Sequence, residues 1–171
     1  MIRSAKKLEQ LSALLERNDN LVISEAVRLL RDEQPFEGAI RLLAALYNRT
    51  EDHSVRKAVE EFMNDLKDQS ACSEVIAEIT KYQEPKTLSM LVASCWQSGL
   101  DYSEFLPEIA GLFSECDYLT AIECFTLIEE TTFHFPTERK NELIEIIRKG
   151  SSTGSDEKKK LLQELVKVLG E

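Results

Sequence analysis

The stretch IRLLAALYNRTEDHSVRKAVEEFMNDL, residues 40–66, contains two apolar patterns separated by a polar turn. Apolar side chains recur three and four residues apart on both sides of the turn, which is the spacing of one face of an α-helix. Asp52 follows the turn, where its carboxylate can accept hydrogen bonds from the first amides of the second helix. The stretch therefore predicts two amphipathic helices joined by a short turn.

The same spacing continues along the chain, and no stretch alternates apolar and polar residues for long enough to predict a strand. The expected helices cover residues 4–17, 20–33, 36–48, 53–68, 72–82, 86–98, 103–115, 118–131, 137–149 and 156–169. Taken in pairs, these helices repeat at intervals of about 33 residues. This period predicts an all-α fold in which about five antiparallel helix pairs stack into an α-solenoid, an alpha-alpha superhelix.

Residues 52–66 resemble the second helix of a HEAT repeat, in which Asp is followed by Val-Arg, a small residue and two spaced large apolar residues. The matching residues are Asp52, Val55, Arg56, Ala58, Phe62 and Leu66, and Leu106-Pro107 is similar to the Leu-Pro of a HEAT first helix. The resemblance implies a HEAT or armadillo-like protein whose second helices line a concave surface. Residues 117–125 also resemble the second helix of a tetratricopeptide repeat, which is the runner-up.

Length and composition predict one helical-repeat domain over residues 1–171, with 43% hydrophobic and 30% charged residues. The only cluster of Gly, Ser and Thr, residues 150–155, predicts a flexible tether. After it, the apolar pattern of residues 156–169 predicts a C-terminal helix that folds back and caps the last pair. A detachable helix that docks elsewhere is the alternative.

The net charge of −10 opposes attraction to phosphate, so we expect neither nucleic acid nor an acidic membrane surface as a partner. The N-terminal residues contain Lys and Glu within the apolar pattern, and no run approaches the ~18 apolar residues of a membrane span. These features predict a cytoplasmic protein.

The sequence contains no motif that predicts catalysis. The two histidines, His53 and His134, belong to different helix pairs, and no phosphate-binding loop, dinucleotide fingerprint or nucleophile motif occurs. The four cysteines lack the Cys-x-x-Cys spacing of metal sites, and we expect neither Cys116 nor Cys124 to have the cationic neighbours that lower the pKa of a thiol. We therefore expect no catalytic residue, no metal, no cofactor and no enzymatic activity, and four buried, unreactive cysteines.

One segment has a one-sided charge. From Thr87 to Glu138, both included, there are nine acidic residues and no Lys or Arg. We predict a partner-binding surface, directed at a basic segment of another protein, that includes Asp101, Glu104, Glu108, Glu115, Glu123, Glu129 and Glu130. An acidic surface that serves only solubility is the alternative interpretation.

The leading functional prediction is a non-enzymatic protein–protein interaction module, a scaffold or adaptor of the HEAT type. Two other functions stay open at this point. One is a HEAT-like enzyme that acts on nucleic acid, and the other is a structural subunit of a homo-oligomer. The sequence selects neither the partner nor the oligomeric state.

Overall fold

A computed structural model describes residues 3–33, 36–150 and 155–170. These residues form ten α-helices and one short 3-10 helix and contain no strand, so the all-α prediction is confirmed. The helices are α1 (Ala5–Leu15), α2 (Asn20–Leu30), α3 (Ala39–Arg49), α4 (His53–Asn64), α5 (Ala71–Ile79), α6 (Pro85–Gln97), η1 (Ser103–Phe105), α7 (Leu106–Glu115), α8 (Tyr118–Thr132), α9 (Thr137–Gly150) and α10 (Asp156–Gly170). The predicted tether falls mainly on residues 151–154, which lie outside the described residues.

The internal contacts divide the chain into two compact units. Unit 1 comprises residues 1–100 and contains α1 to α6, and unit 2 comprises residues 101–171 and contains α7 to α10. The prediction of one domain over the whole chain stays a prediction.

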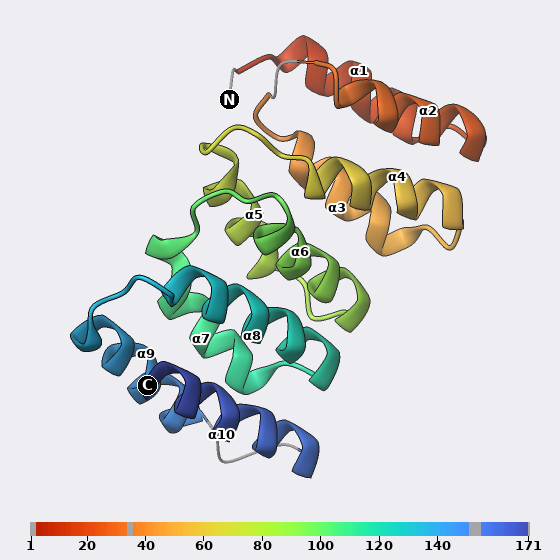
Figure 1. Cartoon of the computed structure of the whole chain (residues 1–171). Coiled ribbons are helices and arrows are strands. Elements are labelled where there is room, and N and C mark those ends of the chain that lie inside the picture. The colour runs from red at the N-terminus through yellow and green to blue at the C-terminus, as the bar shows by residue number, and fades with distance from the viewer. Residues whose placement is uncertain (1–2, 34–35, 151–154, 171) are drawn as a thin grey trace. The chain divides into compact units, whose positions relative to one another are not determined.

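Unit 1 consists of three antiparallel helix hairpins in two layers. The hairpins pair α1 with α2, α3 with α4, and α5 with α6 (Figure 1). The first helices pack successively on one another, α1 on α3 and α3 on α5, and the second helices do the same, α2 on α4 and α4 on α6. Each inner helix therefore hides its apolar face between its hairpin partner and the equivalent helices of the neighbouring hairpins.

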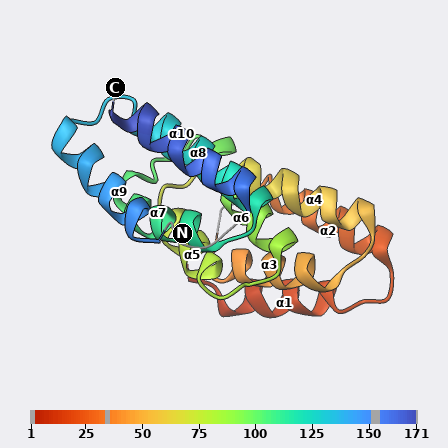
Figure 2. The same cartoon turned by 90° about the horizontal axis from the view of Figure 1, so that it is seen from below.

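Unit 2 follows the same rule with two hairpins. Helix α7 pairs with α8 and packs on α9, while α10 pairs with α9 and packs on α8. Figure 2 shows α8 and α10 side by side in one layer of the unit and α7 and α9 in the other. The core residues include Phe113, Ile128, Ile147 and Leu165, all fully buried. Helix α10 thus contributes to the core of unit 2, and its role as the cap of a repeat stack stays a prediction.

Polar contacts between neighbouring hairpins join residues that lie more than 30 positions apart in the sequence. Arg49 donates to the carbonyl oxygen of Leu15, 34 residues away, at 2.9 Å. In unit 2, Arg139 donates to the carbonyl oxygen of Ser103, 36 residues away, also at 2.9 Å. Other such pairs have separations of 32 to 36 residues. Equivalent positions of successive hairpins therefore meet within each unit.

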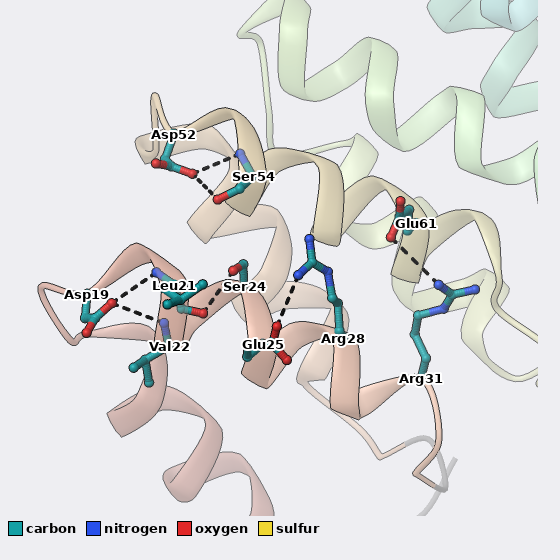
Figure 3. Close-up of polar contacts among 10 residues, drawn as sticks. All are labelled: Asp19, Leu21, Val22, Ser24, Glu25, Arg28, Arg31, Asp52, Ser54 and Glu61. Atoms are coloured by element: carbon teal, nitrogen blue, oxygen red, sulfur yellow. Dashed lines mark hydrogen bonds and ion pairs between the residues drawn. The ribbon is translucent and has the colours of Figure 1, made fainter.

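Aspartate side chains cap three of the second helices, α2, α4 and α8. The Asp19 carboxylate accepts hydrogen bonds from the amides of Leu21 and Val22, and the Asp52 carboxylate accepts from Ser54 at 2.9 Å (Figure 3). Asp117 caps α8 in the same way. These bonds satisfy amides that have no partner within the helix, and they lower the pKa of both Asp52 and Asp117.

Helix α3 begins three residues later than the sequence predicts, at Ala39 rather than residue 36. The reason is Gly38, the residue before α3, whose φ of 91° is left-handed. A right-handed helix cannot continue through this conformation, so α3 starts only after Gly38. Since Gly38 has no side chain, the cap comes from α5, where Glu74 Oε1 accepts from the amides of Gly38 at 3.0 Å and Arg41 at 3.3 Å. A side chain of the next hairpin thus completes the start of α3.

Replacing Glu74 tests this cap between hairpins. We expect Glu74→Ala to lower the free energy of unfolding by about 1 kcal/mol, because two helix amides lose their acceptor. Glu74→Gln should cost less, since its amide oxygen can still accept these hydrogen bonds. The glutamine also carries no charge, so it avoids the unfavourable burial of a carboxylate that raises the pKa of Glu74. Urea unfolding of the two variants measures the difference. Equal losses in both variants would contradict the capping role.

Candidate protein-interaction surfaces

The acidic residues predicted to bind a partner lie at and just before η1 and on α7 and α8, and these two α-helices belong to opposite layers of unit 2. Asp101 precedes η1, and the others follow along the chain. They are Glu104 in η1, Glu108 and Glu115 in α7, and Glu123, Glu129 and Glu130 in α8. All are exposed except Glu123, which is half-buried. The structure therefore does not gather them into one patch, because α7 and α8 belong to different layers.

Few basic side chains offset these charges. In the described part of unit 2, ion pairs on α9 and α10 join Arg148 to Glu145, Lys159 to Asp156, and Lys167 to Glu164. No ion pair among the described residues involves Glu104, Glu108, Glu115, Glu129 or Glu130. Their negative charges are consequently directed at solvent.

The start of the acidic segment differs from the rest, because the fold brings a cation close to it. The pKa of Asp101 is lowered, first by hydrogen bonds from the Ser103 amide and hydroxyl and further by the positive charge of Arg139. Arg139 is the first basic residue after the segment, and α9 returns it to the beginning of η1. Asp101 is thus less suited to recruit a basic partner than the glutamates that follow.

Helix α8 combines acidic and apolar side chains on one exposed face, which we call the α8 strip. Leu119 is 66% exposed, Phe133 is 77% exposed, and Ile122 is also exposed. With Thr126, Glu129 and Glu130, these residues follow the three-and-four spacing of a single helical face. Helix α7 carries exposed glutamates but no exposed large apolar side chain. Of these two helices, α8 therefore has the composition of a contact surface that excludes water.

A second apolar surface lies in unit 1, where α1 and α2 border a groove of about 800 Å³. Two of its lining residues are large and exposed, Leu21 at 70% and Leu29 at 63%. Lys7 and Glu33 form an ion pair of 2.8 Å at its rim. This groove was not predicted from the sequence. Leu21 and Leu29 are eight residues apart, which places both on one helical face and could have indicated an apolar surface.

The other side of α2 faces α4 through polar contacts. Arg31 pairs with Asp65 at 3.0 Å and with Glu61 at 3.8 Å (Figure 3), and Asn20 donates to the Asp52 carboxylate at 3.0 Å. These contacts orient α2 on its neighbour. Leu21 and Leu29 are left on the face that no helix of unit 1 covers.

The prediction for Cys116 is wrong on two points. Cys72, Cys95 and Cys124 are buried as expected, but Cys116 is only partly buried. It also has a cationic neighbour, since Lys158 of α10 donates hydrogen bonds to the carbonyl oxygens of Ser114, at 2.9 Å, and Cys116. The sequence conceals this contact because 42 residues separate the two positions.

The histidines are exposed at the start of α4 and just after α8. Among the described residues, no group of three or more His, Cys, Asp or Glu side chains could hold a metal ion. None of the described helices is long and apolar enough to cross a membrane. The cytoplasmic location and the absence of enzymatic activity stay predictions.

Comparisons with models of protein families, with curated proteins and with solved structures found no significant match to this chain. The HEAT and tetratricopeptide resemblances rest on the residues quoted above.

If the α8 strip serves contact and not folding, its apolar residues can be replaced without loss of stability. We expect Leu119→Gln and Phe133→Gln to change the free energy of unfolding by less than about 0.5 kcal/mol. Leu127→Ala, on the buried face of the same helix, should cost about 2 to 5 kcal/mol. Chemical denaturation of the three variants gives the comparison, and a large loss for either glutamine variant would assign the strip to the core.

Proposed function

We propose that this protein is a non-enzymatic interaction module, a HEAT-like α-solenoid whose α8 strip binds a basic, amphipathic segment of another protein. The repeat architecture is supported by the alternation of two layers within each unit. It is also supported by the polar contacts that join residues 32 to 36 positions apart, which is the length of one predicted repeat. The predicted solenoid is consistent with these contacts.

The observation that carries the binding role is the composition of the α8 strip. Leu119, Ile122 and Phe133 expose apolar surface on the same face as two glutamates without ion-pair partners. Burying a large apolar side chain contributes about 1.5 to 3 kcal/mol, so three such residues can supply useful affinity. The glutamates add attraction to Lys and Arg and raise the rate of encounter.

A partner with a complementary pattern would be a helix that carries apolar residues at intervals of three and four, flanked by Lys or Arg. Its apolar face would cover Leu119 and Phe133, while its basic residues would approach Glu129 and Glu130. The alternative of an enzyme that acts on nucleic acid is disfavoured, because the net charge of −10 repels phosphate.

Two charge-reversed variants separate the α8 strip from general electrostatic attraction. Glu129→Lys with Glu130→Lys changes the strip, and Glu104→Lys with Glu108→Lys makes the same charge change on η1 and α7. The probe is a fluorescent synthetic peptide of Leu and Lys with helical amphipathic spacing. We expect the α8 variant to weaken binding about tenfold and the α7 variant less than about threefold, measured by anisotropy at low and at physiological ionic strength.

The apolar contribution is tested with Leu119→Gln and Phe133→Gln, which leave the net charge unchanged. Each should weaken peptide binding at physiological ionic strength, where screening reduces the contribution of charge. Equal weakening by the α7 and α8 charge variants, with no effect of the glutamine variants, would show nonspecific attraction and contradict the proposal.

A specific observation also favours a second function, self-association through the groove between α1 and α2. Residues 3–33 contain six basic and six acidic side chains, although the whole chain has a net charge of −10. Two copies of an acidic protein repel one another least where their charges balance. In an antiparallel approach of α2 to α2 of a second copy, Leu21 of each chain would lie near Leu29 of the other.

Self-association predicts a dimer that depends on these two leucines. We expect the wild-type protein to sediment as a dimer at high concentration and Leu21→Asp with Leu29→Asp to sediment as a monomer. Leu119→Asp with Phe133→Asp is the matched control, which adds the same charge to α8 and should leave the dimer intact. A monomeric wild-type protein, or a dimer lost only in the control, would contradict this second function.

A further inference from the structure

The end of α7 and the beginning of α8 bring two cysteines together. Cys116 directly follows α7 and is partly exposed, whereas Cys124 is fully buried in the second turn of α8. The Cys124 side chain is hydrogen-bonded to Cys116. The fold therefore places a thiol that solvent can reach directly against one that it cannot.

A buried lysine lies beside this pair. Lys158 of α10 is only 5% exposed, and its ammonium donates to the carbonyl oxygens of Ser114 and Cys116 at the end of α7. Among the described residues no carboxylate forms an ion pair with Lys158. The partial negative charge of the α7 C-terminus compensates the cation only in part, so the site favours an anion next to Cys116.

The Asp117 carboxylate also lies at this site, and its negative charge disfavours a thiolate at Cys116. It is engaged in capping α8, where it accepts from the amide of Leu119 at 2.9 Å and from the Thr120 hydroxyl at 2.5 Å. The pKa of the Cys116 thiol is nevertheless lowered, first by the hydrogen bond with Cys124 and then by the Lys158 ammonium, against the effects of burial and Asp117. The hydrogen bond from Cys124 and the nearby cation thus both favour the thiolate form of Cys116.

We propose that Cys116 and Cys124 form a peroxide-reactive dithiol, with Cys116 as the attacking thiolate and Cys124 as the resolving thiol. The modification is independent of the proposed binding function. It requires a hydroperoxide as the oxidant, and Lys158 acts as a positioning residue that favours the Cys116 thiolate.

The chemistry balances in two steps. The Cys116 thiolate attacks one oxygen of hydrogen peroxide, an S–O bond forms, the O–O bond breaks, and hydroxide leaves and takes up a proton to become water. Cys124 then attacks the sulfur of the Cys116 sulfenic acid, the S–S bond forms, and the departing hydroxide takes the Cys124 proton. In sum, two thiols and one peroxide give one disulfide and two waters.

Cys72 and Cys95 serve as internal controls. Both are buried in unit 1, where Gln69 donates to the Cys72 sulfur and the Cys95 thiol donates to the carbonyl oxygen of Leu91. Neither should react with peroxide while the protein is folded, because burial disfavours the thiolate and keeps the oxidant away from the sulfur.

The reduced, folded protein is treated with one equivalent of hydrogen peroxide, quenched with catalase, alkylated after denaturation and mapped by mass spectrometry. We expect a disulfide that joins Cys116 to Cys124 and unmodified Cys72 and Cys95. Cys124→Ser should stop at a sulfenic acid on Cys116 that dimedone traps, while Cys116→Ser should give neither product. Oxidation of Cys72 or Cys95 to the same extent, or no 116–124 disulfide, would overturn the proposal.

The role of Lys158 has its own measurement. Lys158→Met should slow peroxide oxidation of Cys116 at least about threefold, and Lys158→Arg should restore most of the rate, because it returns the positive charge. Circular dichroism checks that both variants fold.

The wild-type protein gives a test without mutation. The rate of iodoacetamide alkylation of Cys116, measured as a function of pH, should rise with a midpoint below about pH 8.5, which is the pKa of a free cysteine. A midpoint at or above that value would remove the basis for an activated thiol.

Discussion

The structure depends on the burial of one apolar face of each helix between its hairpin partner and the equivalent helix of the next hairpin. Val55, Ala58 and Val59 on α4 are fully buried, and α4 contacts α2, α3 and α6. No single hairpin could exclude water from such a face, so the hairpins are stable only when they pack in succession. Leu21 and Leu29 on α2 lie on a face without such a neighbour and are exposed.

The polar groups at the helix ends also depend on neighbouring helices. Glu74 of α5 caps the amides at the start of α3, and Lys158 of α10 satisfies carbonyl oxygens at the end of α7. In each case a neighbouring helix supplies the partner that the helix end itself lacks. Packing and hydrogen bonding therefore select the same register between hairpins, because a shift of one turn would lose both.

The surface chemistry follows from which face each helix leaves uncovered. The acidic segment of the sequence divides between α7, where the glutamates have no exposed large apolar side chain beside them, and α8, where they share a face with Leu119 and Phe133. Charge alone attracts many basic molecules, whereas charge beside exposed apolar area discriminates among them. That contrast is the reason for placing the proposed binding surface on α8.

The sequence by itself determined the helices, their pairing and the Asp caps, because these depend on residues within a few positions of one another. It also located the acidic residues, including Glu104 and Glu129, but assigned them to one surface. Only the tertiary structure decided that they lie in different layers, that Glu74 of α5 caps the start of α3, and that Lys158 lies beside Cys116. The physical reason is that these contacts join residues 36 to 42 positions apart, and their geometry depends on how whole helices pack, which periodicity does not specify.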